Sequence, residues 1–305
     1  MNGMPTSAAT AAELPRPLVS AVPARPRLGS RPWDPRLYQI TTLGFLLVYG
    51  IGWLDLEVRG DQAVAMLATV LLAQYLGGRL ANPTAARFDP RSALISGLSL
   101  CLLLRTNALW LAVLTAVVAI ASKFLIRWHG KHLFNPTNFA LVFAMLATGA
   151  VWVSPGQWGS VAVFGFFMAS LGGLVVNRAA RSDVTLAFLL SYAALVVGRS
   201  VWFGEPLAIP LHRLSNGALV LFSFFMISDP KTTPDSRAGR ILFAVLVALG
   251  AGFVQFTLHR PNGLLWSLAV VHLAVPLIDR LLPGSRYDWA TRGRPEADLE
   301  RRRAP

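Results

Sequence analysis

Apolar residues group into ten segments along this 305-residue chain, and the charged residues fall mainly in the short loops between them. Eight segments are long enough to cross a bilayer core, which takes about 20 helical residues. The third and eighth segments are shorter and reach only roughly 20 Å as helices. The ten segments are Leu37–Leu54, Gln62–Leu80, Ser92–Leu104, Ala108–Ile126, Pro136–Val153, Gly159–Asn177, Val184–Trp202, Leu214–Ile227, Ile241–Leu258 and Asn262–Leu281.

Because backbone in lipid must satisfy its own hydrogen bonds, the pattern predicts helices wherever these segments meet lipid. Residues 37–283 then form a single membrane domain. The flanks differ in composition: residues 1–36 are rich in Ala, Pro and Arg, and residues 284–305 are polar and basic. We expect both to be cytoplasmic tails, the first disordered. No signal peptide is predicted, because no apolar run follows the first basic residues.

The positions of Lys and Arg test this division. If the N-terminus is inside and every segment crosses, all but five of the 28 Lys and Arg residues lie on the inner side. Positive residues favour the cytoplasmic side of a membrane. The sequence therefore predicts a multi-pass protein of the bacterial cytoplasmic membrane with both termini inside. Omitting either short segment mixes the charges, so both cross as short spans, broken helices or re-entrant hairpins.

The two halves of the chain resemble each other after a shift of about 125 residues. Pro136 then falls on Pro261, and Ser92–Leu104 falls on Gly217–Asp229. Five segments per half is an odd number, so the second half is inverted relative to the first. Paired interrupted segments in inverted repeats mark binding sites in many transport folds. The predicted fold is an all-α polytopic membrane protein of about ten transmembrane helices in two inverted five-helix repeats, residues 37–153 and 159–281. The alternative is a chance match between apolar segments.

Composition excludes several classes of protein. Hydrophobic residues make up 54% and charged residues 14%, against about 25% charged in typical soluble domains. Mean hydropathy is +0.52. A soluble enzyme, a disordered protein and a disulfide-stapled secreted domain are excluded, and Cys101 has no second cysteine to pair with. The net charge of +13 lies beside long apolar runs, so we expect membrane lipid as the partner, not nucleic acid.

Three inner loops, residues 88–98, 130–138 and 227–234, are more polar than their predicted depth requires. Each has a structural interpretation: Asn135-Pro136 starts a helix, Asp229-Pro230 ends one, and Ser96-Gly97 allows two helices to approach closely. The functional interpretation is that the loops gather amide, hydroxyl, ammonium and carboxylate groups beside apolar walls. Such a mixture suits a flat polar ring system.

The same loops resemble motifs of the RnfD/NqrB-like membrane subunits, found in the Rnf electron-transport complex and the sodium-translocating NADH:quinone oxidoreductase. Lys131–Asn138 is similar to that family's Gly-Lys-x-x-x-Asn-Pro loop. Ser92–Leu104 is similar to its Ser-x-x-x-[Ser/Thr]-Gly-Leu-x-x-x-Leu-Leu-Leu segment, and Ser228–Pro234 to its Thr-Asp-Pro-x-[Ser/Thr] loop. The resemblance covers roughly residues 35–283 and is nearest to the divergent branch named UnbU, after enediyne biosynthesis clusters.

The resemblance implies a flavin site and electron transfer within a membrane complex. Other redox subunits or a soluble donor would supply electrons, and quinone is a possible acceptor. The family carries FMN covalently on a Ser-Gly-Ala-Thr motif, which this sequence lacks; the corresponding loop is residues 154–159. The expectation is therefore a non-covalent flavin, riboflavin or FMN. By position, the cofactor-binding residues would be Ser96, Gly97, Lys131, Asn135, Asn138, Asp229, Thr232 and Thr233.

The sequence is also consistent with two other kinds of membrane protein. The chain could be a small-solute transporter or channel of the same architecture, or a cofactor-free structural subunit. No catalytic residue is assigned. No metal site is expected, because His129 and His132 lie in a basic loop. His272 lies within the tenth segment and is either functional or a neutral hydrogen-bonded side chain.

Cysteine labelling tests the predicted topology. In a chain whose Cys101 is replaced, Gln157→Cys should react with a membrane-impermeant reagent added to intact cells, because residue 157 lies in an outer loop. Arg237→Cys should be protected on the inner side. The reverse pattern would contradict the ten-segment topology.

Overall fold

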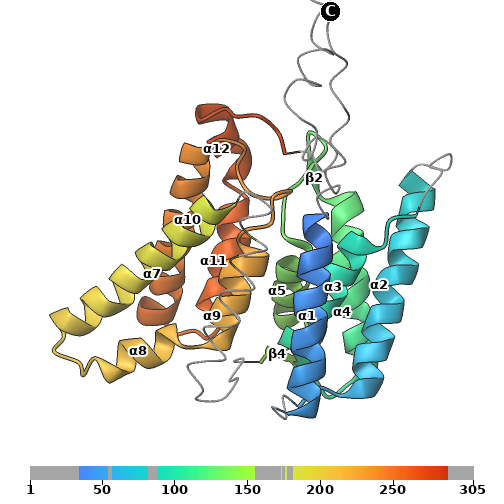
Figure 1. The fold of residues 1–305 in the computed structure, drawn as a ribbon, viewed down its shortest axis with the longest axis horizontal. Helices are drawn as coiled ribbons and strands as arrows, with labels where there is room; N and C mark the ends of the chain where they lie inside the picture. The colour runs from blue at the N-terminus through green and yellow to red at the C-terminus, as the bar shows by residue number, and fades with distance from the viewer. Residues whose placement is uncertain are drawn as a thin grey trace, which may run out of the picture. The chain divides into compact units, whose positions relative to one another are not determined.

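The computed structural model describes residues 34–53, 57–81, 88–154, 173, 176 and 181–287, and this part of the chain is mainly helical (Figure 1). Most of both predicted tails, and all of the sixth segment except Gly173 and Val176, lie outside the described residues. The α-helices are α1 (Pro35–Gly52), α2 (Gly60–Ala81), α3 (Arg91–Leu103), α4 (Leu109–Leu125), α5 (Pro136–Thr148), α7 (Ser182–Trp202), α8 (Ala208–Leu214), α9 (Gly217–Leu221), α10 (Arg237–Gly252), α11 (Gly263–His272) and α12 (Val275–Leu281).

Three described helices are long and apolar enough to cross a membrane: Gly60–Ala81, Ser182–Trp202 and Arg237–Thr257. A fourth candidate is the pair α11 and α12, which is bent by 53°. Pro276 lies in the first turn of α12, where a proline cannot continue the hydrogen bonding of the preceding helix. These helices support a membrane location. The full set of ten spans stays a prediction.

Two strands connect the ends of the short helices α3 and α5. Strand β1 (Leu104–Thr106) follows α3 and pairs antiparallel with β4 (Val151–Val153), which follows α5. Helix α5 ends because Gly149 adopts a left-handed conformation with φ of 62°. The predicted segment Pro136–Val153 is therefore not one continuous helix, although the described chain is mainly helical as predicted. All three residues of β1 are buried, and the pairing satisfies backbone groups that water does not reach.

A second strand pair forms a hairpin between α4 and α5. Its strands are β2 (Arg127–Trp128) and β3 (Lys131–His132), paired antiparallel. The turn residues His129 and Gly130 both have positive φ, 47° and 76°. Two consecutive left-handed residues are typical of a tight two-residue hairpin turn. The hairpin returns the chain from the end of α4 to the start of α5, at the opposite end of α4 from β1.

The eighth and ninth predicted segments contain π-helical turns. Helix α9 continues directly as the π-helix η1 (Phe222–Met226), and α10 continues as η2 (Phe253–Thr257). The short eighth segment is thus helical but irregular. A π-helical turn is rare and is often found at functional sites.

Helices pack in the same order in the two halves of the chain. Helix α2 packs on α4 and α4 on α5, while α7 packs on α10 and α10 on α11. Contacts between α5 and α11 join the two sets, which are seen as neighbouring groups in Figure 1. This order is what the predicted repeat requires, but the inverted relation of the halves stays a prediction.

Gly97 allows α3 to lie close to α2. A Cβ atom at Gly97 would lie 2.7 Å from Val70 Cγ2 and 3.1 Å from Leu67 Cδ2. The backbone of α3 therefore occupies the space that a side chain would need. This is the close helix approach that the Ser96-Gly97 pair predicted.

We expect Gly97→Ala to lower the free energy of unfolding by about 1–3 kcal/mol, because the added methyl group overpacks the α2–α3 interface. Thermal unfolding of the purified protein in detergent measures this. The matched control is Gly78→Ala in α2, where no atom lies within 4 Å of the new Cβ. Equal unfolding midpoints for the two variants would show that the interface tolerates the methyl group.

Candidate functional site

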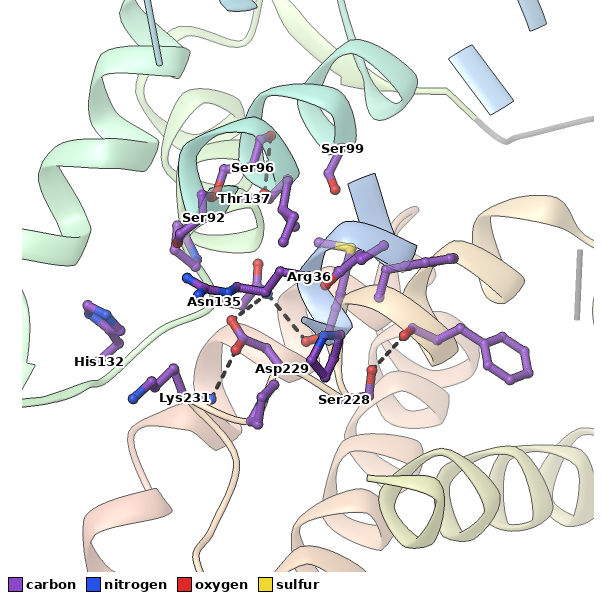
Figure 2. A pocket seen from close by; sticks show the side chains of 18 of the residues that line it. Arg36, Ser92, Ser96, Ser99, His132, Asn135, Thr137, Ser228, Asp229 and Lys231 are labelled. Atoms are coloured by element: carbon purple, nitrogen blue, oxygen red, sulfur yellow. Dashed lines mark hydrogen bonds between the residues drawn. The ribbon is translucent and has the colours of Figure 1, made fainter. Parts of the chain in front are cut away.

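Two cavities share a wall at η1, where Met226 lines both. The first, which we call the polar cavity, has a volume of about 80 Å³ and lies between α1, α3, the start of α5 and the loop after η1 (Figure 2). Its polar lining residues are Arg36, Gln39, Ser92, Ser96, Ser99, Lys123, His132, Asn135, Thr137, Ser228, Asp229 and Lys231.

Asn135 connects two sides of the polar cavity. Its Oδ1 accepts a hydrogen bond from the backbone N–H of Asn138 at 3.1 Å, which caps α5. Its Nδ2 donates to the Met226 carbonyl at 3.3 Å and to Asp229 Oδ2 at 3.4 Å (Figure 2). The helix start predicted from Asn135-Pro136 is confirmed. The same side chain also attaches α5 to η1 and its following loop.

Asp229 organises the loop after η1. Its Oδ1 accepts from the backbone N–H of Lys231 at 3.0 Å, and its carbonyl accepts from the backbone N–H groups of Thr232 and Thr233. This is the Asx-type turn expected of an ordinary loop aspartate. Burial raises the pKa of Asp229 above its ordinary value, although the charges of Lys123 and Lys231 act in the opposite direction.

Lys123 is a buried cation of the polar cavity that the sequence interpretation did not assign to the site. It lies at the end of α4 with 5% of its surface exposed. Its Nζ donates to the Ser92 carbonyl at 2.9 Å and to Ser92 Oγ at 3.1 Å. The sequence did contain a signal for this site, because Lys123 lies inside the apolar segment Ala108–Ile126. The sequence interpretation used this lysine only to orient the chain in the membrane.

Lys131 lies outside the polar cavity. Its Nζ forms ion pairs with Asp279 Oδ2 at 2.7 Å and Asp235 Oδ1 at 3.0 Å. Asp279 also accepts from the backbone N–H of Asp235 at 2.8 Å. Lys131 therefore ties β3 to α12 and to the loop before α10.

The remaining predicted cofactor residues hold helices and loops together. Thr233 Oγ1 accepts from Arg181 Nε at 3.1 Å, and Thr232 Oγ1 donates to the Asp229 carbonyl at 3.3 Å. Asn138 Nδ2 donates to the Leu265 carbonyl at 3.2 Å and joins α5 to α11. Of the predicted set, the structure brings three residues together around one cavity: Ser96, Asn135 and Asp229.

The second cavity, which we call the aromatic cavity, has a volume of about 410 Å³. Tyr192 Oη donates to Gln255 Oε1 at 2.9 Å, which holds both side chains in the cavity wall. The Arg213 guanidinium lies 5.2 Å from the centre of the Phe256 ring. The lining residues are Leu103, Trp152, Val153, Ser154, Tyr192, Arg213, Asn216, Ala218, Leu219, Phe222, Met226, Gln255, Pro261, Asn262, Gly263, Leu264 and Leu265.

The volumes of the two cavities decide which one can hold a flat ring. Ligand pockets for small molecules and cofactors usually measure about 300–1,000 Å³. The polar cavity, at about 80 Å³, is far below this range, and the aromatic cavity, at about 410 Å³, lies within it. The sequence interpretation missed the aromatic cavity, although the polar residues Asn216 and Asn262 at the starts of two apolar helices were a signal.

Helices long and apolar enough to cross a membrane, together with a ligand-sized cavity, indicate a membrane protein with a candidate cofactor site. Comparison with known proteins adds the family. The model of the NQR2, RnfD, RnfE family matches residues 147–288. The resemblance of this chain to the RnfD/NqrB-like family is thus confirmed, at modest sequence identity.

Curated relatives agree with the family match. A protein of Citrobacter koseri that is named as a subunit of an ion-translocating oxidoreductase complex is 28% identical over 153 residues, which are 50% of this chain and 41% of that protein. A relative from Escherichia coli O9:H4 with the same name is 28% identical over 138 residues, 45% of this chain and 37% of that protein. The chain thus spans about two fifths of the length of these relatives. The family match contains every described lining residue of the aromatic cavity except Leu103.

The pH dependence of stability tests the environment of His132. Burial, with the positive charges of Arg127, Lys123 and Lys231, lowers the pKa of His132 to about 4, from an ordinary value of about 6.5. As the pH falls, His132 therefore binds a proton at a higher pH in the unfolded chain than in the folded protein. We expect the free energy of unfolding to fall by on the order of 1–3 kcal/mol as the pH falls from 6.5 towards 4.

His132→Gln should remove this part of the pH dependence, as measured by thermal unfolding in detergent across the same pH range. The exposed His212 provides the control, because His212→Gln changes no buried group. A wild-type pH dependence in His132→Gln would contradict the assignment.

Proposed function

We propose that this chain is a membrane subunit of an electron-transport complex and that it holds a flavin, without a covalent bond, in the aromatic cavity. The relatives named as subunits of an ion-translocating oxidoreductase complex support the first part. The aromatic cavity supports the proposed flavin, because its volume suits a cofactor and its lining residues lie almost wholly within the family match.

The chemistry of the aromatic cavity fits a flavin ring. Trp152, Tyr192 and Phe222 offer flat apolar surfaces, on which a ring system can stack. Arg213 and Asn216 offer hydrogen-bond donors for the polar edge of the ring. The Asn216 side-chain oxygen already accepts from the backbone N–H of Ala218 at 2.7 Å, which orients the amide. The cofactor would supply the redox chemistry, and the protein its binding, orientation and electrostatics.

Arg213 has a further effect on the proposed cofactor. Its fixed positive charge would favour added negative charge on a cofactor bound beside it, and so would raise the reduction potential of that cofactor. The Phe256 ring holds the guanidinium in place. We infer that Arg213 both binds the ring and tunes its potential. Trp152, by contrast, contributes contact area alone.

The proposed partners are other redox proteins and the membrane. Other subunits or a soluble donor would supply the electrons, and quinone is the candidate acceptor. The protein lies in the bacterial cytoplasmic membrane with both termini inside, as the distribution of Lys and Arg predicts. The attachment is non-covalent because the chain lacks the Ser-Gly-Ala-Thr acceptor motif.

Flavin content tests the proposal. The full chain, purified from membranes in a mild detergent, should show the visible absorption of flavin. Acid precipitation should release that flavin into the supernatant. Absence of flavin from the purified protein would contradict the proposed function, and fluorescence that stays with the denatured polypeptide would contradict the non-covalent attachment.

Matched variants locate the flavin. Arg213→Gln should weaken flavin retention about tenfold or more, because a hydrogen bond to a charged group contributes about 1.5–3 kcal/mol. Asp229→Asn alters the polar cavity and should keep wild-type flavin content. Thermal unfolding of both apoproteins controls for folding. Loss of flavin in Asp229→Asn and its retention in Arg213→Gln would place the cofactor in the polar cavity, contrary to the proposal.

A further inference from the structure

A third cavity, which we call the basic pocket, lies between the β2–β3 hairpin and the loop after η1. Its volume is about 160 Å³, and Arg127, Lys131, Lys231 and Arg286 contribute positive charge to its lining. Asp235 is the one carboxylate among its described lining residues. The pocket is distinct from the aromatic cavity and takes no part in the proposed flavin site.

The positive charges of the basic pocket are only partly compensated. Lys131 is neutralised by its ion pairs with Asp235 and Asp279. Arg127 and Arg286 form no ion pair with any carboxylate of the described residues. The Arg127 Nε donates to the Lys123 carbonyl, and Arg286 Nη1 donates to the His129 carbonyl at 3.0 Å. These backbone contacts orient two guanidinium groups and leave further N–H donors on each.

The backbone of the hairpin fixes this arrangement. Gly130 has φ of 76°, and the Arg286 Nη2 atom lies 3.8 Å from the position of a Cβ built on it. Arg286 therefore lies against the tight turn at the tip of the hairpin. Arg127 belongs to strand β2 of the hairpin, and the hydrogen bond to the His129 carbonyl attaches Arg286, from the segment after α12, to the hairpin turn.

Exposed side chains indicate where the β2–β3 hairpin lies relative to lipid. Leu125 and Trp128 flank Arg127 in sequence and are 81% and 55% exposed. An exposed tryptophan beside basic residues at the end of an apolar helix is typical of the membrane–water interface. Lipid phosphates lie at that level, and basic pockets between helices on the cytoplasmic side bind anionic headgroups.

We propose that the basic pocket binds a phosphate group through the guanidinium groups of Arg127 and Arg286. Guanidinium is planar and presents paired N–H donors that match two phosphate oxygens. A volume of about 160 Å³ admits a phosphate group but is too small for a nucleotide or a flavin. The phosphate belongs either to an anionic lipid headgroup or to free phosphate, and one experiment distinguishes the two.

The experiment titrates the full chain in a non-ionic detergent with short-chain phosphatidylglycerol and, separately, with inorganic phosphate at constant ionic strength. Tryptophan fluorescence, to which Trp128 beside the pocket contributes, reports saturation. We expect Arg127→Gln with Arg286→Gln to weaken the apparent affinity roughly tenfold to thirtyfold, because each interfacial arginine contributes about one factor of five to anion binding. The control is Arg237→Gln with Arg280→Gln, which removes two exposed positive charges outside the pocket.

A second variant, Arg127→Lys with Arg286→Lys, keeps the charge and loses the paired donors. It should bind the titrated ligands with intermediate affinity. As a control on folding, the unfolding midpoint of every variant without ligand should match that of the wild type. If phosphatidylglycerol saturates the site and inorganic phosphate does not, the ligand is a lipid headgroup. If inorganic phosphate also saturates the site, the ligand is the phosphate group itself. Either outcome supports the site. Equal weakening by the pocket and control variants, or the absence of saturation by either ligand, would overturn it.

Discussion

The structure depends on one constraint: backbone groups that water does not reach must find partners within the protein. Helices α3 and α5 are each 13 residues long, or roughly 20 Å, and are too short to cross a bilayer alone. The β1–β4 pair extends both helices and satisfies the backbone beyond their ends. Gln62 Nε2 also donates to the Thr106 carbonyl at 2.9 Å, and Arg105 Nη1 donates to the Leu104 carbonyl at 2.8 Å. With their far ends joined in this way, the N-terminal ends of α3 and α5 meet at the polar cavity.

Ion pairs between distant parts of the chain hold the loop ends of the helices in place. Asp34 binds Arg36 and Arg91, and these two arginines also bind Asp89, so the start of α1 is attached to the start of α3. Burial alone raises the pKa of Asp34, but hydrogen bonds from Arg36 and the charge of Arg91 leave it below its ordinary value. Lys131 links β3 to α12 in a similar way. Removing one member of a partly buried pair leaves a charge without compensation, so such pairs specify position more than they add stability.

The polar cavity shows how a sequence motif typical of binding can be used for structure. The amide of Asn135, the carboxylate of Asp229 and the ammonium group of Lys123 all form hydrogen bonds within the chain. Their donors and acceptors connect α3, α4, α5 and the loop after η1, and little volume remains between them. The aromatic cavity has the opposite character, because its volume is about five times larger. Space, more than the density of polar residues, distinguishes a candidate cofactor site here.

Local sequence determined the features whose physical cause lies within a few residues. Asn135-Pro136 starts α5, Gly149 ends it, and three of the long apolar segments form helices that are long and apolar enough to cross a membrane. The loop motifs were also sufficient to identify the family resemblance. Tertiary structure alone decided the features that depend on residues far apart in the chain. Lys131 pairs with carboxylates 104 and 148 positions away, and β1 pairs with a strand from another helix end. The aromatic cavity takes its walls from six of the ten apolar segments. A local pattern specifies which groups need a partner, but the packing of the helices selects that partner.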